Sequence, residues 1–195
     1  MNFFKKLLNI AVPSIEEVPV PVKDPLSLDD SFVHQFIEKG GKFLYCSTKE
    51  EVLENLQHIV SENNWSELVC TDKKLLEKFK KSEVSLVENT KHSAPFLTSC
   101  EHLISDNGQI LFSSNQLKSQ KLPEFHDHFI VYAKTSQLVN NVGQGLTGIK
   151  TNFKGNIPTN ISAVKNYVLT KDDDNFMNYG SSNSKNLYLL LFEDL

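Results

Sequence analysis

The amino-acid sequence predicts an α/β domain built on an open, mostly parallel sheet. Between residues 29 and 87, short apolar segments alternate with amphipathic segments of helical length, which is the pattern of parallel strands joined by crossover helices. Residues 129–133 and 186–192 are almost wholly apolar, as expected of strands that helices cover on both faces. The chain has 195 residues, enough to bury a core of ordinary size.

The first half of the domain is expected to alternate helices with strands. Oxygen-bearing side chains at residues 29–31 are suited to cap the first helix, and Gly40 and Gly41 are suited to end it. Ser47 or Thr48 caps the second helix, which has a clear apolar face. The expected order is a helix from residue 29, a strand at 42–46, the second helix, a strand at 67–70, a helix at 72–79 and a strand at 84–87.

The second half is richer in predicted strands. Apolar runs predict strands at 96–98, 109–113, 129–133 and 186–192, with a helical turn over 99–105, a short helix over 136–142 and a longer helix over 157–169. Residues 143–155 hold four glycines and are expected to form a loop. Within it, residues 143–148 spell GxGxxG, but no strand leads directly into them and no helical stripe follows. We therefore do not interpret this motif as a dinucleotide site.

The N-terminal part is expected to lie outside the folded body. Residues 1–10 carry two lysines among large apolar side chains, and residues 11–28 contain four prolines. Because proline fixes φ and lacks an amide hydrogen, we predict an amphipathic segment and an extended arm over residues 1–28, then the α/β domain over 29–195. The apolar run after Lys6 is too short for a signal peptide or a membrane span.

Composition narrows the classes of function. The chain has 20 basic and 24 acidic residues, a net charge of −4, so we expect no nucleic-acid partner. We also expect no membrane partner, because no apolar segment is long enough to span a bilayer. Its three cysteines, Cys46, Cys70 and Cys100, include no CxxC pair, which is the usual spacing for structural zinc or iron–sulfur ligands. We expect no disulfide, no metal and no resident cofactor, and a reducing cytoplasmic location.

One stretch resembles a known family. Residues 97–100, residues 104–111 with their Asp106-Asn107-Gly108 turn, the Ser113-Ser114 pair and the LPEFH step at 122–126 together resemble the lactate-utilisation (LUD) domain family, in particular its protein C-like members. The opening helix, glycine pair and strand at 29–46, and the turn at 180–182 before the last strand, also resemble that family. The resemblance covers roughly residues 29–195.

The resemblance implies a fold and a role. The implied fold is the Rossmann-like sheet shared by sugar-phosphate isomerases and CoA-transferases. The implied role is that of a protein which accompanies iron–sulfur subunits in the oxidation of L-lactate to pyruvate. The sequence departs from the family at Asn107 and Gln109, and its late turn lacks the family's histidine.

Several polar residues are candidates for binding a small carboxylate or phosphate. Asp106, Asn107 and Gly108 form either a tight turn or the rim of a sheet crevice. Gly180 and Ser181 either supply backbone amides to an anion or form an ordinary loop. The other candidates are Ser113, Ser114 and Lys118, which follow a strand, and His126 and His128, which precede one.

The two histidines share one side of the incoming strand, because side chains alternate along it. They suit a metal pair or a general base, but a third metal ligand is missing. A hydrogen-bonded strand entry is the alternative that we favour.

Three hypotheses for the function follow. The first is a non-catalytic accessory or ligand-binding subunit of a lactate-oxidation system, and it is the one that we favour. The second is an enzyme of the CoA-transferase or formyl-folate cyclo-ligase kind acting on an acyl or phosphorylated substrate. For this enzyme, Asp106, Lys118 and Lys121 are the only candidate site residues in the sequence. The third is an interaction module whose residues 1–8 dock on a partner.

Overall fold

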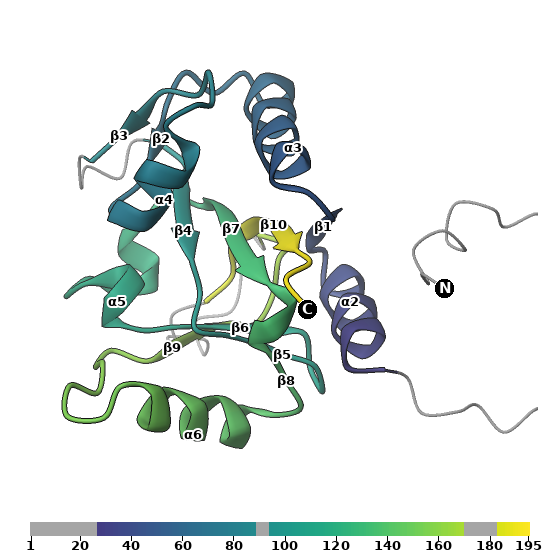
Figure 1. Ribbon diagram of the computed structural model, residues 1–195, viewed down its shortest axis with the longest axis vertical. Helices are drawn as coiled ribbons and strands as arrows, with labels where there is room; N and C mark the ends of the chain where they lie inside the picture. Colours follow the sequence, from purple (N-terminus) through teal and green to yellow (C-terminus); the bar gives the residue numbers. More distant parts are fainter. Residues whose placement is uncertain (1–26, 89–93, 170–182) are drawn as a thin grey trace, which may run out of the picture.

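The structure, a computed structural model, describes residues 27–88, 94–169 and 183–195. A six-stranded sheet in the order β1-β10-β7-β4-β2-β3 lies at its centre, and every pairing within it is parallel. The α/β open-sheet class predicted from the sequence is therefore confirmed (Figure 1). The strands are β1 (Lys42–Cys46), β2 (Leu68–Val69), β3 (Leu86–Val87), β4 (Phe96–Ser99), β7 (His128–Lys134) and β10 (Asn186–Phe192).

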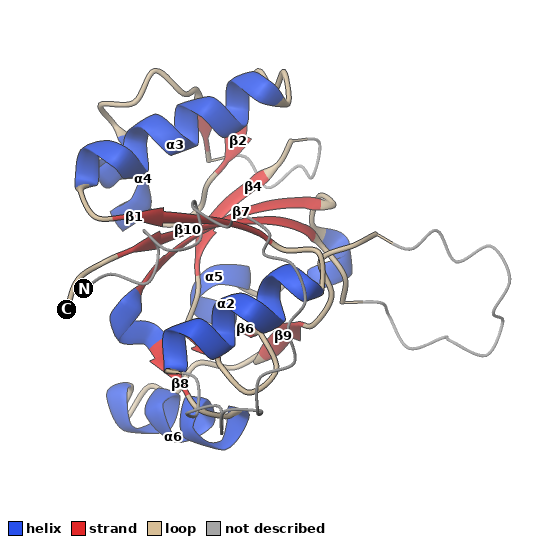
Figure 2. Cartoon of the chain, turned by 90° about the vertical axis from the view of Figure 1, so that its right-hand side faces the viewer, coloured by secondary structure: helices blue, strands red, loops and turns tan. Residues whose placement is uncertain are grey.

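Helices cover both faces of this sheet. α3 (Lys49–Glu62) and α4 (Lys73–Phe79) lie on one face, and α2 (Leu28–Glu38) and α5 (Ser114–Leu117) lie on the other (Figure 2). Successive side chains of a strand point to opposite faces. In β7, Phe129 and Val131 therefore enter the core beneath α2, whereas Ile130 and Tyr132 enter the core beneath α3 and α4.

A second, smaller sheet lies beyond α2 and α5. It has the order β8-β5-β6-β9, with α6 (Val142–Asn152) at the outer end of the molecule (Figure 2). Leu103 and Ile110 of this sheet belong to the same core as the inner residues of β7, so the two sheets pack as one body. Short 3₁₀ turns at Leu122–Glu124 and Thr135–Gln137 link elements of the two sheets. The strands of the small sheet are β5 (His102–Ile104), β6 (Gln109–Phe112), β8 (Leu138–Val139) and β9 (Ser162–Val164).

Three local predictions are wrong at this second sheet. The expected helical turn at 99–105 contains β5, the expected helix at 136–142 is a 3₁₀ turn followed by β8, and the expected helix at 157–169 contains β9. The strands within these segments are only two or three residues long, too short for an apolar pattern to distinguish strand from helix. Pairing with distant strands decides the outcome, since β6 joins β5 on one side and β9 on the other.

The loop predicted at 143–155 is also wrong, because most of it is helix α6. The side chain of Asn141 accepts a hydrogen bond from the Gln144 amide and caps the helix. A Cβ at Gly145 would lie 2.9 Å from Leu111 Cδ1, and one at Gly148 would lie 2.8 Å from His102 Nε2. These glycines lie inside a helix and permit its close approach to the small sheet, so the GxGxxG run does not form the strand-to-helix turn of a dinucleotide site.

The beginning of the domain differs slightly from expectation. α2 starts at Leu28 and is capped by Ser27, whose side chain accepts from the Asp30 amide, whereas the sequence pointed to residues 29–31 as the cap. Residues 1–26, with most of the predicted amphipathic segment and arm, lie outside the described residues. Within the described part of the chain, no helix has both the length and the apolar character needed to cross a membrane.

Candidate functional site at the carboxyl edge of the sheet

All six strands of the central sheet run in the same direction, so their carboxyl ends meet along one edge. We call this the carboxyl edge. In open α/β sheets, ligands bind in the crevice outside this edge. Its central strands end at Ser99 in β4, Lys134 in β7 and Phe192 in β10.

A lysine lies on aromatic rings at this edge, on the side of α3 and α4. Lys78 Nζ is 4.6 Å from the ring centroid of Tyr132 and 5.8 Å from that of Phe192. Among the described residues, Lys78 forms no ion pair with a carboxylate. Burial, and next the positive charge of Lys134, lower the pKa of the Lys78 ammonium group. The cation is therefore held by ring faces rather than by a counter-charge.

The hydroxyl of Tyr132 is buried beside this lysine. The residue is 5% exposed, and its oxygen has no hydrogen-bond partner among the described residues. Burial raises the pKa of the phenol, so the group stays a neutral donor at physiological pH. A buried donor without an acceptor is costly, typically about 1–3 kcal/mol. Such exceptions call for an explanation, and a ligand that supplies the acceptor is one.

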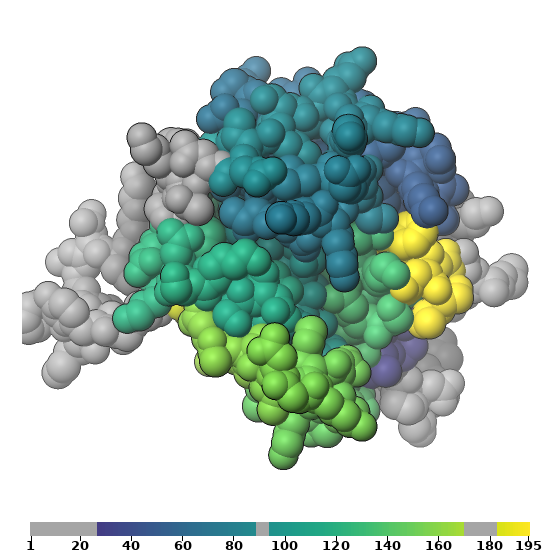
Figure 3. Space-filling view, turned by 60° about the vertical axis from the view of Figure 1, so that its left-hand side comes forward, coloured from purple at the N-terminus to yellow at the C-terminus, as the bar shows by residue number. Residues whose placement is uncertain are grey.

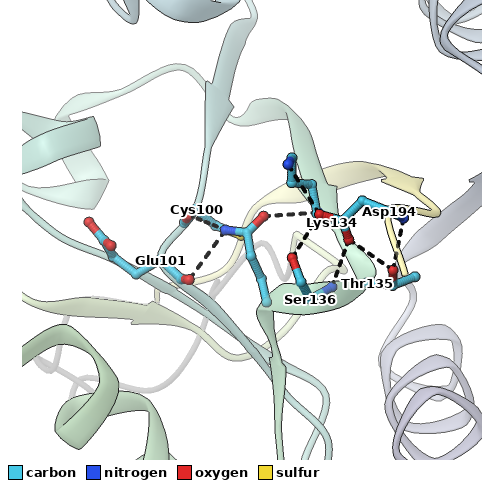
Figure 4. A network of polar contacts seen from close by, with 7 residues as sticks. Cys100, Glu101, Lys134, Thr135, Ser136 and Asp194 are labelled. Carbon is cyan, nitrogen blue, oxygen red and sulfur yellow. Dashed lines mark hydrogen bonds and ion pairs between the residues drawn. The ribbon is translucent and has the colours of Figure 1, made fainter. Parts of the chain in front are cut away.

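The ends of β7 and β10 are joined by a network around Asp194. Its carboxylate accepts hydrogen bonds from Thr135 Oγ1 at 3.0 Å and from the amide and hydroxyl of Ser136 at 3.0 and 2.8 Å, and Lys134 Nζ lies at 3.1 Å (Figure 4). Burial raises the pKa of this carboxyl group, but the hydrogen bonds from Ser136 and those from Lys134 and Thr135 outweigh it and lower the pKa to about 2. The ammonium group of Lys134 therefore forms an ion pair with Asp194.

A second carboxylate, Glu101, lies just beyond the end of β4. It accepts hydrogen bonds from Ser113 Oγ at 2.6 Å, Asn115 Nδ2 at 2.8 Å and Gln116 Nε2 at 3.2 Å. The Gln137 side chain donates to the carbonyl oxygens of Cys100 and Glu101 at 2.6 and 3.2 Å, which fixes the bend after β4. Its partners hold this carboxylate in one orientation.

Two hollows adjoin the carboxyl edge, one on each face of the sheet. The hollow between the start of α3 and α4 has a volume of about 280 Å³ and includes Lys49, Lys78 and Lys81 in its lining. The other, beside the start of α2, has a volume of about 490 Å³ and includes Leu28, Tyr45 and Leu138. In Figure 3, the teal residues around α4 lie above the green and yellow residues that end β7 and β10.

The sequence-predicted residues 106–108 lie in the turn between β5 and β6, away from the carboxyl edge. Lys39, which directly follows α2, donates a hydrogen bond from its side chain to the Asn107 carbonyl. The Asp106 amide donates to the Asn140 carbonyl at 2.9 Å, and Tyr167 Oη donates to the Gly108 carbonyl at 2.5 Å. The backbone of this turn is therefore occupied by contacts within the fold.

The predicted serines and lysine lie at the start and end of α5. Ser113 caps that helix and contacts Glu101. Among the predicted residues that the structure describes, it alone shares the polar network beyond β4. Ser114 Oγ accepts from the Thr159 amide at 3.0 Å. Lys118 donates to the Asn115 carbonyl at 2.8 Å.

The two predicted histidines lie at the opposite edge of the sheet, where β7 begins. Their rings are 5.2 Å apart, and His126 Nδ1 accepts from the His128 amide at 3.0 Å. Burial lowers the pKa of both rings. Among the described residues, no group of three histidine, cysteine or carboxylate side chains could hold a metal ion. The remaining predicted residues, Gly180 and Ser181, lie outside the described residues.

The residues of the carboxyl edge were not singled out from the sequence. Tyr132 lies in the segment 129–133 that was correctly predicted as a strand, and Lys134 directly follows that segment. Asp194 follows β10. These residues could have been predicted from the sequence, because a polar residue just after a buried parallel strand lies at the edge where open α/β sheets bind ligands. Lys78 carries no such signal, because only the packing of α4 brings it to the rings.

Comparison with solved structures finds a protein of similar fold. No family model and no curated protein matches the sequence. The crystal structure of a DUF162 family protein from Deinococcus radiodurans superposes with a TM-score of 0.61 at 13% sequence identity, over 87% of this chain and 99% of that one. The two proteins share a fold. This DUF162-like fold is an open α/β sheet, in agreement with the topology above.

Proposed function

We propose that this protein is a LUD-type accessory subunit, which holds a small carboxylate or phosphate at the carboxyl edge and works beside iron–sulfur subunits in the oxidation of L-lactate to pyruvate. Two independent likenesses carry the proposal. The sequence motifs around residues 97–126 resemble the LUD family, and the fold is similar to that of a DUF162 protein, DUF162 being the LUD-like domain family.

The residues at the carboxyl edge support a binding role. Lysine, hydroxyl and amide groups gather there, and the carboxylates of Asp194 and Glu101 are each engaged by several donors. A carboxylate so engaged is a poor nucleophile, because the hydrogen bonds stabilise its charged form. The alternative of an enzyme gains nothing from Asp106 and Lys118, which lie beyond opposite ends of β6.

The accessory role is tested by affinity purification of the tagged protein from its native cells. We expect stoichiometric co-purification of subunits that contain iron and acid-labile sulfide, and L-lactate oxidation by the recovered complex with an artificial electron acceptor. The same tag on an unrelated domain is the control. Recovery of the protein without an iron–sulfur partner would refute the accessory role.

A further inference from the structure

The hollow beside the start of α2 has apolar walls that are only partly covered. Its volume is about 490 Å³, within the range of about 300–1,000 Å³ that is usual for binding pockets. Leu28 and Leu195 in its lining are 42% and 90% exposed. Apolar surface left open beside a hollow is typical of an interaction site. The leucines of the lining are Leu28, Leu138, Leu191 and Leu195.

The charge of this hollow is negative. Asp29 and Glu193 line it, and no lysine or histidine in the described part of the chain does. Neither carboxylate forms an ion pair with a described lysine or histidine. Burial, and next a hydrogen bond to Glu193, raise the pKa of Tyr45, so the phenol stays protonated and donates to that carboxylate. The occupant that fits is therefore apolar with positive charge beside its apolar part.

The N-terminal segment of this chain has the matching composition. Its apolar residues at positions 3, 4, 7 and 8 have the spacing that places side chains on one face of a helix. Lys5 and Lys6 lie between them, and their two positive charges balance those of Asp29 and Glu193. The hollow between α3 and α4 is lined by three lysines and would repel the same segment.

The segment is tethered close to this hollow. Residues 9–26 separate it from the described part of the chain, and these 18 residues can span up to about 60 Å when extended. Leu28, two residues further on, itself lines the hollow. A tether of this kind gives an effective concentration in the millimolar range. At about 1 mM, a dissociation constant of about 0.1 mM leaves about 90% of the molecules docked.

We propose that residues 3–8 of this chain bind in the hollow beside the start of α2. Their apolar side chains pack on its leucines, and Lys5 and Lys6 pair with Asp29 and Glu193 at its edge, as long lysine side chains can reach around an apolar contact. The segment then covers one of the two hollows that adjoin the carboxyl edge. The inference does not depend on the proposed function, because the negative charge of this hollow repels a small carboxylate or phosphate.

The experiment is zero-length cross-linking of the full-length protein with a water-soluble carbodiimide, which joins a lysine amine to a carboxylate in direct contact. Mass spectrometry identifies the linked peptides in an equal mixture of ¹⁵N-labelled and unlabelled protein, so that links within one molecule differ in mass from links between two. Phe4→Ser combined with Leu8→Ser removes apolar contacts and keeps both lysines. Asn9→Ser is the matched control, a polar exchange in the same part of the chain. Thermal unfolding verifies that each variant is folded.

We expect links from Lys5 or Lys6 to Asp29 or Glu193 within single molecules. The double serine variant should lower their yield about 10-fold or more, because the loss of two buried apolar side chains leaves only a small docked fraction. Asn9→Ser should stay within about 2-fold of the wild type.

A second measurement does not depend on the cross-linking chemistry. The backbone amide NMR shifts of Leu138 and Leu191, which line the hollow, should change in the double serine variant and not in Asn9→Ser. Unchanged shifts in the double variant would overturn the inference and favour docking of the segment on a partner. Links found only between differently labelled molecules would also overturn it, because the segment would then dock on a second copy of the chain.

Discussion

Gly108→Ala should destabilise the fold much more than the same change at Gly155. Both glycines have positive φ, +63° and +87°, so alanine at either position incurs the left-handed cost of about 1–2 kcal/mol. At Gly108 the new Cβ would also lie 2.7 Å from the backbone carbon of Gln35 and the backbone nitrogen of Phe36 in α2, whereas at Gly155 it would meet nothing within 4 Å.

Both variants incur the same backbone cost, so the difference between their losses of unfolding free energy measures the steric clash of the new Cβ alone. Backbone atoms of a packed helix cannot turn aside as a side chain can, so we add an overpacking cost of about 1–3 kcal/mol for Gly108→Ala. The expected loss of unfolding free energy is then about 2–5 kcal/mol at Gly108 and about 1–2 kcal/mol at Gly155.

Urea denaturation followed by circular dichroism measures both losses. Thermal unfolding should agree, since 1 kcal/mol shifts Tm by about 2–4 °C in a domain of this size. Equal losses in the two variants would refute the packing of the β5–β6 turn against α2. The comparison also bears on Gly108 as a ligand candidate, because a residue this important to stability should be tested for binding only in variants shown to be folded.

Three further predictions concern pH and the N-terminal segment. Burial lowers the pKa of His126 and His128 below 6.5, so the unfolded state binds more protons than the folded state and stability should fall as pH drops below about 6.5. Replacing both histidines by Gln should make the denaturation midpoint depend less on pH between pH 7 and 5. An unchanged dependence on pH would contradict this. The pKa of Asp194 is lowered from 3.8 to about 2, so this residue contributes stability above pH 4 that is lost as pH falls toward 2. Asp194→Asn should remove this loss from the acid-unfolding curve. Identical acid-unfolding curves for the wild type and the variant would count against the network. The hypothesis that residues 1–8 dock on a partner predicts that deleting residues 1–26 reduces recovery of the partner in affinity purification and leaves the thermal unfolding temperature unchanged. A lower Tm would show instead that the segment stabilises the domain.

The sequence predicted the central sheet well for a physical reason. Strands such as 129–133 and 186–192 are covered on both faces and are therefore almost wholly apolar. This pattern can be recognised in the sequence without knowing which strands they pair with. The helices between them are amphipathic and carry recognisable caps, including the Thr48 capping box of α3.

The small sheet was missed because its strands depend on distant partners. β5 has only three residues, and it becomes a strand by pairing with β6 and β8. α6 was missed for a related reason. Its glycines have low helix propensity, and their value lies in the contacts with Leu111 and His102 that they permit. Neither effect can be read from local sequence.

The candidate site was predicted less well than the fold. Ser113 was identified, but its partner Glu101 was not. The two residues are twelve positions apart in the sequence, and only the β5–β6 hairpin brings them together. Lys78 and Tyr132 come from elements that the sequence predicted, yet their contact depends on how α4 crosses the sheet. Sequence patterns locate elements, whereas a site depends on side chains from several of them.

The place of β10 in the sheet constrains how the chain folds. β10 lies between β1 and β7, and the Lys42–Tyr188 hydrogen bond joins residues 146 positions apart. Until β10 is synthesised, β1 and β7 each present an unpaired edge, which is prone to association with other chains. Completion of the sheet must then await a long-range contact, which slows folding. We expect the nascent chain to depend on chaperones until its last strand leaves the ribosome.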